Sequence, residues 1–334
     1  MNKYDYAPLN TTLAVYETEL LDESDFASLL SAPTLEDALN ILDKTVYEIP
    51  ADVADTKNFE GFLGRRLRII FESLEASILD SRLIGVFSWR YTYHNLKVLM
   101  KASAIKENLD HLLAPMGMPV DQLKAFLNTG DGQRLPRTLV ESTREVQEVL
   151  AHDGDLGNID IIYDRAYLAH IQEIANELDD PQVTETTNMV VDFENLSALL
   201  RAMKQNKSQG FIRSILSDEG AVRIDELVEH ASTNNIDGIV DAFLSTTYGG
   251  YLERVLLEED LSFTDPAVVS AAIYKAKAIF YRNYSLEPFG PMPVIAYLHF
   301  LFNEINNIRL ILIGKDNGVP NKTITERMRP IYGI

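Results

Sequence analysis

The stretch WRYTYHNLKVLM, residues 89–100, decides how the rest of the chain is interpreted. Its large apolar side chains recur every three or four residues, which is the spacing of one helix face. They are Trp89, Tyr93, Leu96 and Met100. Asn95 lies inside this apolar pattern. A buried amide needs hydrogen-bond partners and often fixes the register of neighbouring helices, so Asn95 is predicted to be structural.

The same arrangement occurs twice more along the chain. Asn195 lies in FENL and Asn307 lies in INNI, 100 and 112 residues after the preceding copy. Solenoid repeats are roughly 20–50 residues long, so this period predicts whole domain-sized units instead. We expect three helical repeat units, 1–115, 116–218 and 219–334, with Asn95, Asn195 and Asn307 as structural repeat positions.

The N-terminal segment matches a later part of the chain at a constant offset of 201 residues, about two repeat lengths. The matching pairs are Leu35 and Ile236, Leu39 and Val240, Leu42 and Phe243, Thr45 and Thr246, and Tyr47 and Tyr248. This agreement predicts that the N-terminal segment completes one of the three units. Similar units that meet through similar faces predict a closed, pseudo-threefold funnel; an open stack of the units is the alternative.

Local signals favour an all-α fold. Thr34 followed by Asp37, and Asp265 followed by proline, are typical of helix starts. Gly210 and the pair Gly249-Gly250 predict helix breaks. We find no run of alternating polar and apolar residues that would predict strands.

Composition narrows the possible partners. The chain has 334 residues, 46% of them apolar, no cysteine and a net charge of −20. The lack of cysteine excludes disulfides, thiolate metal sites and a cysteine nucleophile. The negative charge argues against nucleic acid and anionic lipid as partners. It has two open interpretations: it favours a cationic protein partner, or it serves solubility alone. The apolar stretch 294–302 is too short to span a bilayer, so no direct insertion is expected.

No catalytic, cofactor-binding or metal-ligating set is found in the sequence. No Gly-x4-Gly-Lys-[Ser/Thr] motif occurs, and the six histidines are scattered without metal-ligand spacing. The turn formed by Tyr248, Gly249, Gly250 and Tyr251 has two open interpretations. It is either a partner-contacting turn, because glycine and tyrosine favour interfaces, or a helix stop with ordinary packing.

Both ends of the chain resemble one family. The N-terminal pattern is PTLEDA at 33–38, followed by Leu42, Thr45 and Tyr47. The C-terminal pattern is EPFG at 287–290, EINNIR at 304–309 and IGK at 313–315. These motifs resemble the C subunit of the rotary V-type and A-type ATPases, the counterpart of the d subunit of the eukaryotic V-ATPase.

The resemblance implies a funnel of three helical domains on the cytoplasmic face of the membrane rotor ring, which is made of proteolipid subunits. It also implies that the central shaft, of D-type and F-type subunits, docks into the funnel. The chain would transmit torque between ATP hydrolysis or synthesis and H⁺ or Na⁺ transport, without a cofactor or chemistry of its own. Two alternatives stay open: a triplicated scaffold outside any rotary motor, and an all-α enzyme with a Mg²⁺-binding pocket.

Overall fold

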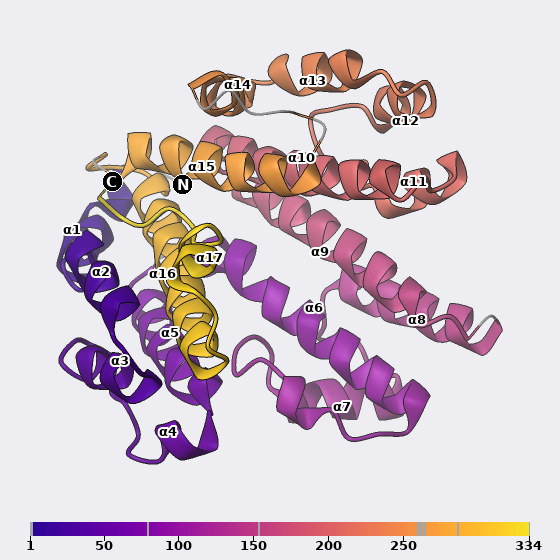
Figure 1. Ribbon diagram of the computed structural model, residues 1–334. Coiled ribbons are helices and arrows are strands. Elements are labelled where there is room, and N and C mark those ends of the chain that lie inside the picture. The colour runs from indigo at the N-terminus through magenta and orange to yellow at the C-terminus, as the bar shows by residue number, and fades with distance from the viewer. Residues whose placement is uncertain are drawn as a thin grey trace. The chain divides into compact units, whose positions relative to one another are not determined.

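The structure is a computed structural model of the chain, drawn in Figure 1. It describes residues 3–78, 80–152, 154–258, 263, 265–285 and 287–333. These residues form 17 α-helices and two 3-10 helices, with no strand among them. The prediction of an all-α fold is therefore confirmed.

The chain divides into two compact units. Unit 1 comprises residues 1–80, 251–261 and 270–334, and unit 2 comprises residues 81–250 and 262–269. Each unit has its own core and is described by itself. The boundaries of the three repeats and their funnel arrangement stay predictions.

Unit 1 is built around its last long helix, α16. Its helices are η1 (Lys3–Tyr6), α1 (Ala7–Glu17), α2 (Glu23–Ser31), α3 (Leu35–Leu42), α4 (Val53–Thr56), α5 (Phe59–Ser77), α16 (Met292–Asp316) and α17 (Asn321–Thr325), with most of α14 (Gly249–Glu258) and α15 (Pro266–Tyr284). Helix α16 contacts α1, α3, α5 and α17 (Figure 1). Its side chains are buried on nearly every face, which explains why its sequence is apolar all round.

Unit 2 is built around helix α9. Its helices are α6 (Arg82–Ile105), η2 (Asp110–Leu112), α7 (Val120–Thr129), α8 (Arg137–His152), α9 (Gly157–Leu178), α10 (Pro181–Lys204), α11 (Gln209–Ile215), α12 (Ile224–Ser232) and α13 (Ile236–Leu244). Helix α9 packs against α6, α8 and α10. Tyr163 of α9 and Tyr93 of α6 lie in the core with ring centroids 6.1 Å apart. This core places the buried residues of α6 and α10 that are described below.

Two predicted helix starts are confirmed. The hydroxyl of Thr34 accepts the N–H of Asp37 at 3.1 Å before α3. Asp265 accepts the N–H of Ala267 at 3.1 Å, and α15 begins at Pro266 between them. Each side chain satisfies a backbone donor that the first helical turn leaves unpaired.

The predicted break at Gly210 is wrong, because Gly210 is the second residue of α11. Ser208 caps this helix by accepting the N–H of Phe211 at 3.2 Å, and the capping stabilises the glycine in a helical turn. Gly249 and Gly250 open α14, so the break at this place lies immediately before them. None of the helices in the described part of the chain has the length and the apolar run that crossing a membrane requires.

Candidate functional site

Asn195, on α10, is buried and uses both ends of its amide group. Its Nδ2 donates to the carbonyl oxygen of Ser217 at 2.9 Å, and its Oδ1 accepts the N–H of Ser217 at 2.9 Å. The side chain therefore binds the backbone of a segment 22 residues further along the chain. A buried amide that is satisfied in this way holds two segments in one register.

Asn307 and Asn95 bind the backbone in the same manner. Asn307, on α16, donates to the carbonyl oxygen of Arg329 and accepts its N–H, both at 2.8 Å. Asn95, on α6, donates to the carbonyl oxygen of Ala114 at 3.1 Å and accepts its N–H at 2.8 Å. All three asparagines thus bind the segment that follows their helix. The shared geometry supports the proposal that they are equivalent repeat positions.

A second polar side chain lies three residues before each asparagine, about one helical turn earlier. On α10 it is Asp192, whose buried carboxylate accepts the N–H of Ala221 at 3.1 Å and the N–H of Val222 at 3.2 Å. It also accepts the hydroxyl of Tyr248. Gly220 permits this approach of the loop, since an added Cβ would lie 2.8 Å from the Cγ of Asp192. Burial raises the pKa of Asp192 above its ordinary value.

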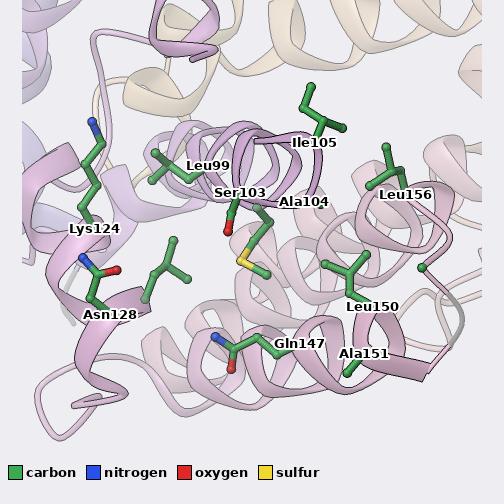
Figure 2. A pocket seen from close by; sticks show the side chains of 13 residues that line it. Leu99, Ser103, Ala104, Ile105, Lys124, Asn128, Gln147, Leu150, Ala151 and Leu156 are labelled. Carbon is green, nitrogen blue, oxygen red and sulfur yellow. The ribbon is translucent and has the colours of Figure 1, made fainter. Parts of the chain in front are cut away.

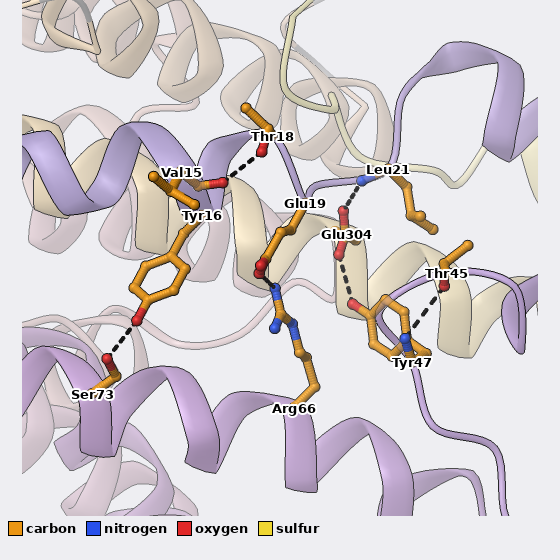
Figure 3. Close-up of polar contacts among 10 residues, drawn as sticks. All are labelled: Val15, Tyr16, Thr18, Glu19, Leu21, Thr45, Tyr47, Arg66, Ser73 and Glu304. Atoms are coloured by element: carbon orange, nitrogen blue, oxygen red, sulfur yellow. Dashed lines mark hydrogen bonds and ion pairs between the residues drawn. The ribbon is translucent and has the colours of Figure 1, made fainter.

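The residue at the same position on α16 is Glu304. Its carboxylate accepts the N–H of Leu21 at 2.5 Å and the hydroxyl of Tyr47 at 2.6 Å (Figure 3). Burial raises the pKa of Glu304 to about 7. Leu21 and Tyr47 lie 201 residues before Val222 and Tyr248, which bind Asp192. The offset noted in the sequence therefore recurs at the level of individual hydrogen bonds.

The third copy, on α6, uses a hydroxyl group. Thr92 is buried, and its Oγ1 accepts the N–H of Met118 at 2.9 Å. Met118 lies two residues before α7, as Val222 lies two residues before α12. Counting on from that match, the residue that corresponds to Tyr248 is Arg144. Thr92 thus has the backbone donor but no equivalent tyrosine.

The threonines at the same offset also agree. Thr45 donates to the carbonyl oxygen of Leu42 at 2.6 Å, and Thr246 donates to that of Phe243 at 2.7 Å. Both hydroxyls shape the turn that leads to the tyrosine two residues later. The prediction that the N-terminal segment completes a unit therefore has support from matching contacts of a backbone N–H, a tyrosine and a threonine.

The four residues of the turn at 248–251 differ in burial and in their contacts. Tyr248 is buried and donates to Asp192, while Gly249 is buried against the backbone of the preceding turn. An added Cβ at Gly249 would lie 2.7 Å from the Cα of Leu244. Gly250 is exposed, and Tyr251 is half-buried with its hydroxyl accepting the Nδ2 of Asn283 at 3.0 Å. Partner contact at this turn stays a proposal, and Gly250 and Tyr251 have the surface to make it.

A groove of about 770 Å³ lies in unit 2 between α6, α7 and α8. Figure 2 shows apolar side chains around it, among them Leu99, Ile105 and Leu150. Lys124 is the one charged residue in its described lining, and it pairs with Asp110 at 3.3 Å. The groove therefore lacks the convergent carboxylates that a Mg²⁺-dependent enzyme needs.

A smaller groove of about 230 Å³, beside α8 and α9, does have an acidic lining. Its carboxylates are Glu141, Glu145, Asp218 and Glu219, and Arg165 lies among them. However, no three His, Cys, Asp or Glu side chains within the described ranges are close enough together to hold a metal ion.

Elsewhere in unit 2, His170 is buried against Trp89, with ring centroids 4.4 Å apart, and burial lowers its pKa to about 4.

The buried polar groups described above all serve the chain's own packing. The carboxylates, amides and hydroxyls are bound to the backbone and to tyrosines of this same chain, so they stabilise one arrangement of its helices. Residues 9–327 match the family model described as ATP synthase (C/AC39) subunit, and the chain belongs to this family. The resemblance seen in the terminal motifs is thereby confirmed.

Curated relatives carry two related names. The chain is similar to the C subunit of the V-type sodium ATPase of Enterococcus hirae, with 29% identity over 99% of this chain and 100% of that protein. It is also similar to the C subunit of the A-type ATP synthase of a Desulfurococcus species, with 25% identity over 96% of this chain and 90% of that protein. The corresponding A-type subunit of Pyrococcus abyssi is 21% identical over 96% and 89%. This chain is thus an accessory subunit of a rotary V/A-type ATPase and is not itself catalytic.

Proposed function

We propose that this chain is a central-stalk subunit that joins the membrane rotor ring to the central shaft. It would sit on the cytoplasmic face of the membrane as a peripheral subunit, with the proteolipid ring on one side and D-type and F-type shaft subunits on the other. It would turn with both and transmit torque. Because the relatives' names include a sodium ATPase and ATP synthases, the proposal covers both directions of energy conversion.

The observation that carries this proposal is the recurrence of the same buried contacts on α6, α10 and α16. A part that transmits torque must resist shear between its helices. The bonds of Asn95, Asn195 and Asn307 join each long helix to the segment that follows it, in addition to apolar packing. Close-packed interiors transmit strain, and satisfied buried polar networks add rigidity. These properties suit a protein that couples two moving parts.

The family assignment disfavours the two alternatives. A triplicated adaptor outside a rotary motor would not be expected to match this family over residues 9–327. An all-α enzyme with a Mg²⁺-binding pocket would need carboxylates close enough together to hold the ion, and no such group occurs within the described ranges.

Removal of the subunit tests the proposal. A membrane preparation of the ATPase without this chain should lose its catalytic head or hydrolyse ATP without moving ions. Addition of the full-length chain should restore coupling, and an equal amount of heat-unfolded chain is the control. Coupled ion transport that continues at the wild-type level without the subunit would overturn the proposal.

Salt dependence tests the electrostatic part of partner binding. The net charge of −20 favours partners with cationic contact surfaces. Exposed charges are screened beyond about 8 Å at physiological ionic strength, so binding should weaken as salt rises. The measurement is the Kd for the isolated shaft subunits in a salt series, with sucrose of matched osmolarity as control. A Kd that does not change with salt argues against charge-driven docking.

A further inference from the structure

We propose that Glu304 is a proton-operated latch for residues 21–47, which we call the N-terminal block. The block contains α2 and α3 and docks against α16 in unit 1. In the protonated form of Glu304 the block stays docked, and loss of the proton loosens it. This inference does not rest on the proposed function, since it concerns unit 1 by itself.

The geometry places Glu304 where it controls both ends of the block. One carboxyl oxygen accepts the N–H of Leu21 at 2.5 Å, and the other accepts the hydroxyl of Tyr47 at 2.6 Å (Figure 3). Leu21 precedes α2 and Tyr47 follows α3, so one side chain binds the two segments that border both helices. A further contact holds the middle of the block, where Lys315 of α16 donates to the carbonyl oxygens of Leu30 and Ala32 at 2.6 Å.

The charges near Glu304 leave its negative form poorly compensated. Arg66 of α5 is the cation that favours ionised Glu304, but its guanidinium donates to Glu19 at 2.8 Å. Asp25 of α2 adds a negative charge that opposes ionisation. The neighbouring phenols of Tyr47 and Tyr297 carry no charge to balance it, because burial raises the pKa of each hydroxyl.

The remaining helices that pack on α16 do not supply a positive charge that compensates ionised Glu304. The acidic residues of α3, Glu36 and Asp37, are exposed, and so is Lys322 of α17. Glu17, at the end of α1, is half-buried with a pKa that burial raises. The carboxylate of Glu304 thus has hydrogen-bond donors but lacks a dedicated cation within the described part of unit 1.

The direction of the effect follows from the two pKa values. Burial raises the pKa of docked Glu304 to about 7, whereas its ordinary value of 4.5 applies when the block opens and water reaches the carboxyl group. The docked state therefore binds the proton more tightly. Docking is strongest below pH 4.5 and weakens as pH rises towards 7, with opening becoming roughly tenfold more populated per pH unit. Above the docked pKa, the population no longer changes.

Helix α6 provides an internal control. Thr92 occupies the position of Glu304 and accepts the N–H of Met118, but a hydroxyl group does not titrate in this pH range. Opening around Met118 should thus be independent of the proton that Glu304 binds. Asp192 of α10 is the second carboxyl group at this position, and burial raises its pKa as well.

Amide hydrogen exchange on the full-length chain tests the latch. Exchange of the Leu21 amide is measured from about pH 5 to pH 8.5 and divided by the intrinsic rate, which yields the opening equilibrium. The wild type should open roughly tenfold more per pH unit up to the plateau. Glu304→Gln should remove this slope, while Tyr47→Phe should move the plateau to higher pH, because the Tyr47 hydrogen bond favours the ionised form.

Three results would overturn the latch. The first is a Leu21 opening equilibrium that is flat across this pH range in the wild type. The second is an equal slope at Met118, which would indicate opening of the whole protein rather than of the block. The third is a slope that persists in Glu304→Gln. The wild-type comparison of Leu21 with Met118 decides the question even if neither variant folds.

Discussion

Helices α6 and α10 have the same buried asparagine but differ one turn earlier. On α6, Thr92 accepts a single backbone N–H, from Met118. On α10, Asp192 collects three donors, two from the backbone at 221–222 and one from Tyr248. A hydroxyl group thus joins two segments, whereas a carboxylate at the equivalent position joins three. Both helices therefore have a hydrogen-bond acceptor at the same position, but the number of donors that this acceptor binds differs.

The largest expected loss of stability comes from replacing Asp192, which binds more donors than Thr92 does. Asp192→Ala would leave three donors without their acceptor, and each unsatisfied buried donor costs roughly 1–3 kcal/mol, so we expect a loss of about 4 kcal/mol. Thr92→Val removes one acceptor and should cost about 1 kcal/mol. Denaturant unfolding followed by circular dichroism measures both. Equal losses for the two variants would contradict the difference between hydroxyl and carboxylate.

The next effect tests whether the three asparagines are equivalent. Alanine at Asn95, Asn195 or Asn307 leaves a backbone N–H and a C=O unsatisfied, so each change should cost about 2–4 kcal/mol. Asn306→Ala is the matched control. Among the described residues its amide bonds to Phe302 and Arg309 of the same helix, and its loss should cost less than about 1 kcal/mol. If alanine at one of the three positions does not lower the stability, that asparagine is not equivalent to the other two.

The smallest expected loss of stability concerns the two glycines of the turn at 248–251. Gly249→Ala forces a Cβ against the backbone of Leu244 and should cost about 1–3 kcal/mol. Gly250→Ala meets no atom within 4 Å and should stay within about 0.5 kcal/mol of the wild type. Thermal unfolding compares the pair. If Gly250→Ala weakens shaft binding while stability is unchanged, the turn contacts a partner; unchanged binding argues for packing alone.

Much of the fold could be predicted from the sequence because its signals are local or periodic. The apolar spacing around Asn95 predicts a buried helix, and Thr34 predicts the start of α3. The offset of 201 residues links Tyr47 with Tyr248 without any knowledge of their contacts. These signals depend on side-chain identity at fixed spacing, and identity is what a sequence displays.

The acceptors one turn before each asparagine were missed for a physical reason. Thr92, Asp192 and Glu304 are three different residue types that share only the ability to accept a hydrogen bond. Their main partners are backbone N–H groups, which leave no mark on side-chain identity. The one signal in the sequence was positional, three residues before each repeat asparagine. At Gly210 the sequence did contain a signal, but the prediction from it was wrong. Glycine predicts a helix break, yet it is tolerated in an exposed helical turn.

The most direct test of the central claim is to observe whether this subunit rotates. The chain has no cysteine, so Gly210→Cys adds one labelling site, on an exposed residue where a Cβ meets no atom within 4 Å. The labelled subunit is assembled into an ATPase complex that is immobilised by its catalytic head. On addition of ATP, we predict that the probe rotates together with the central shaft. A probe that stays still while the shaft turns would contradict the account.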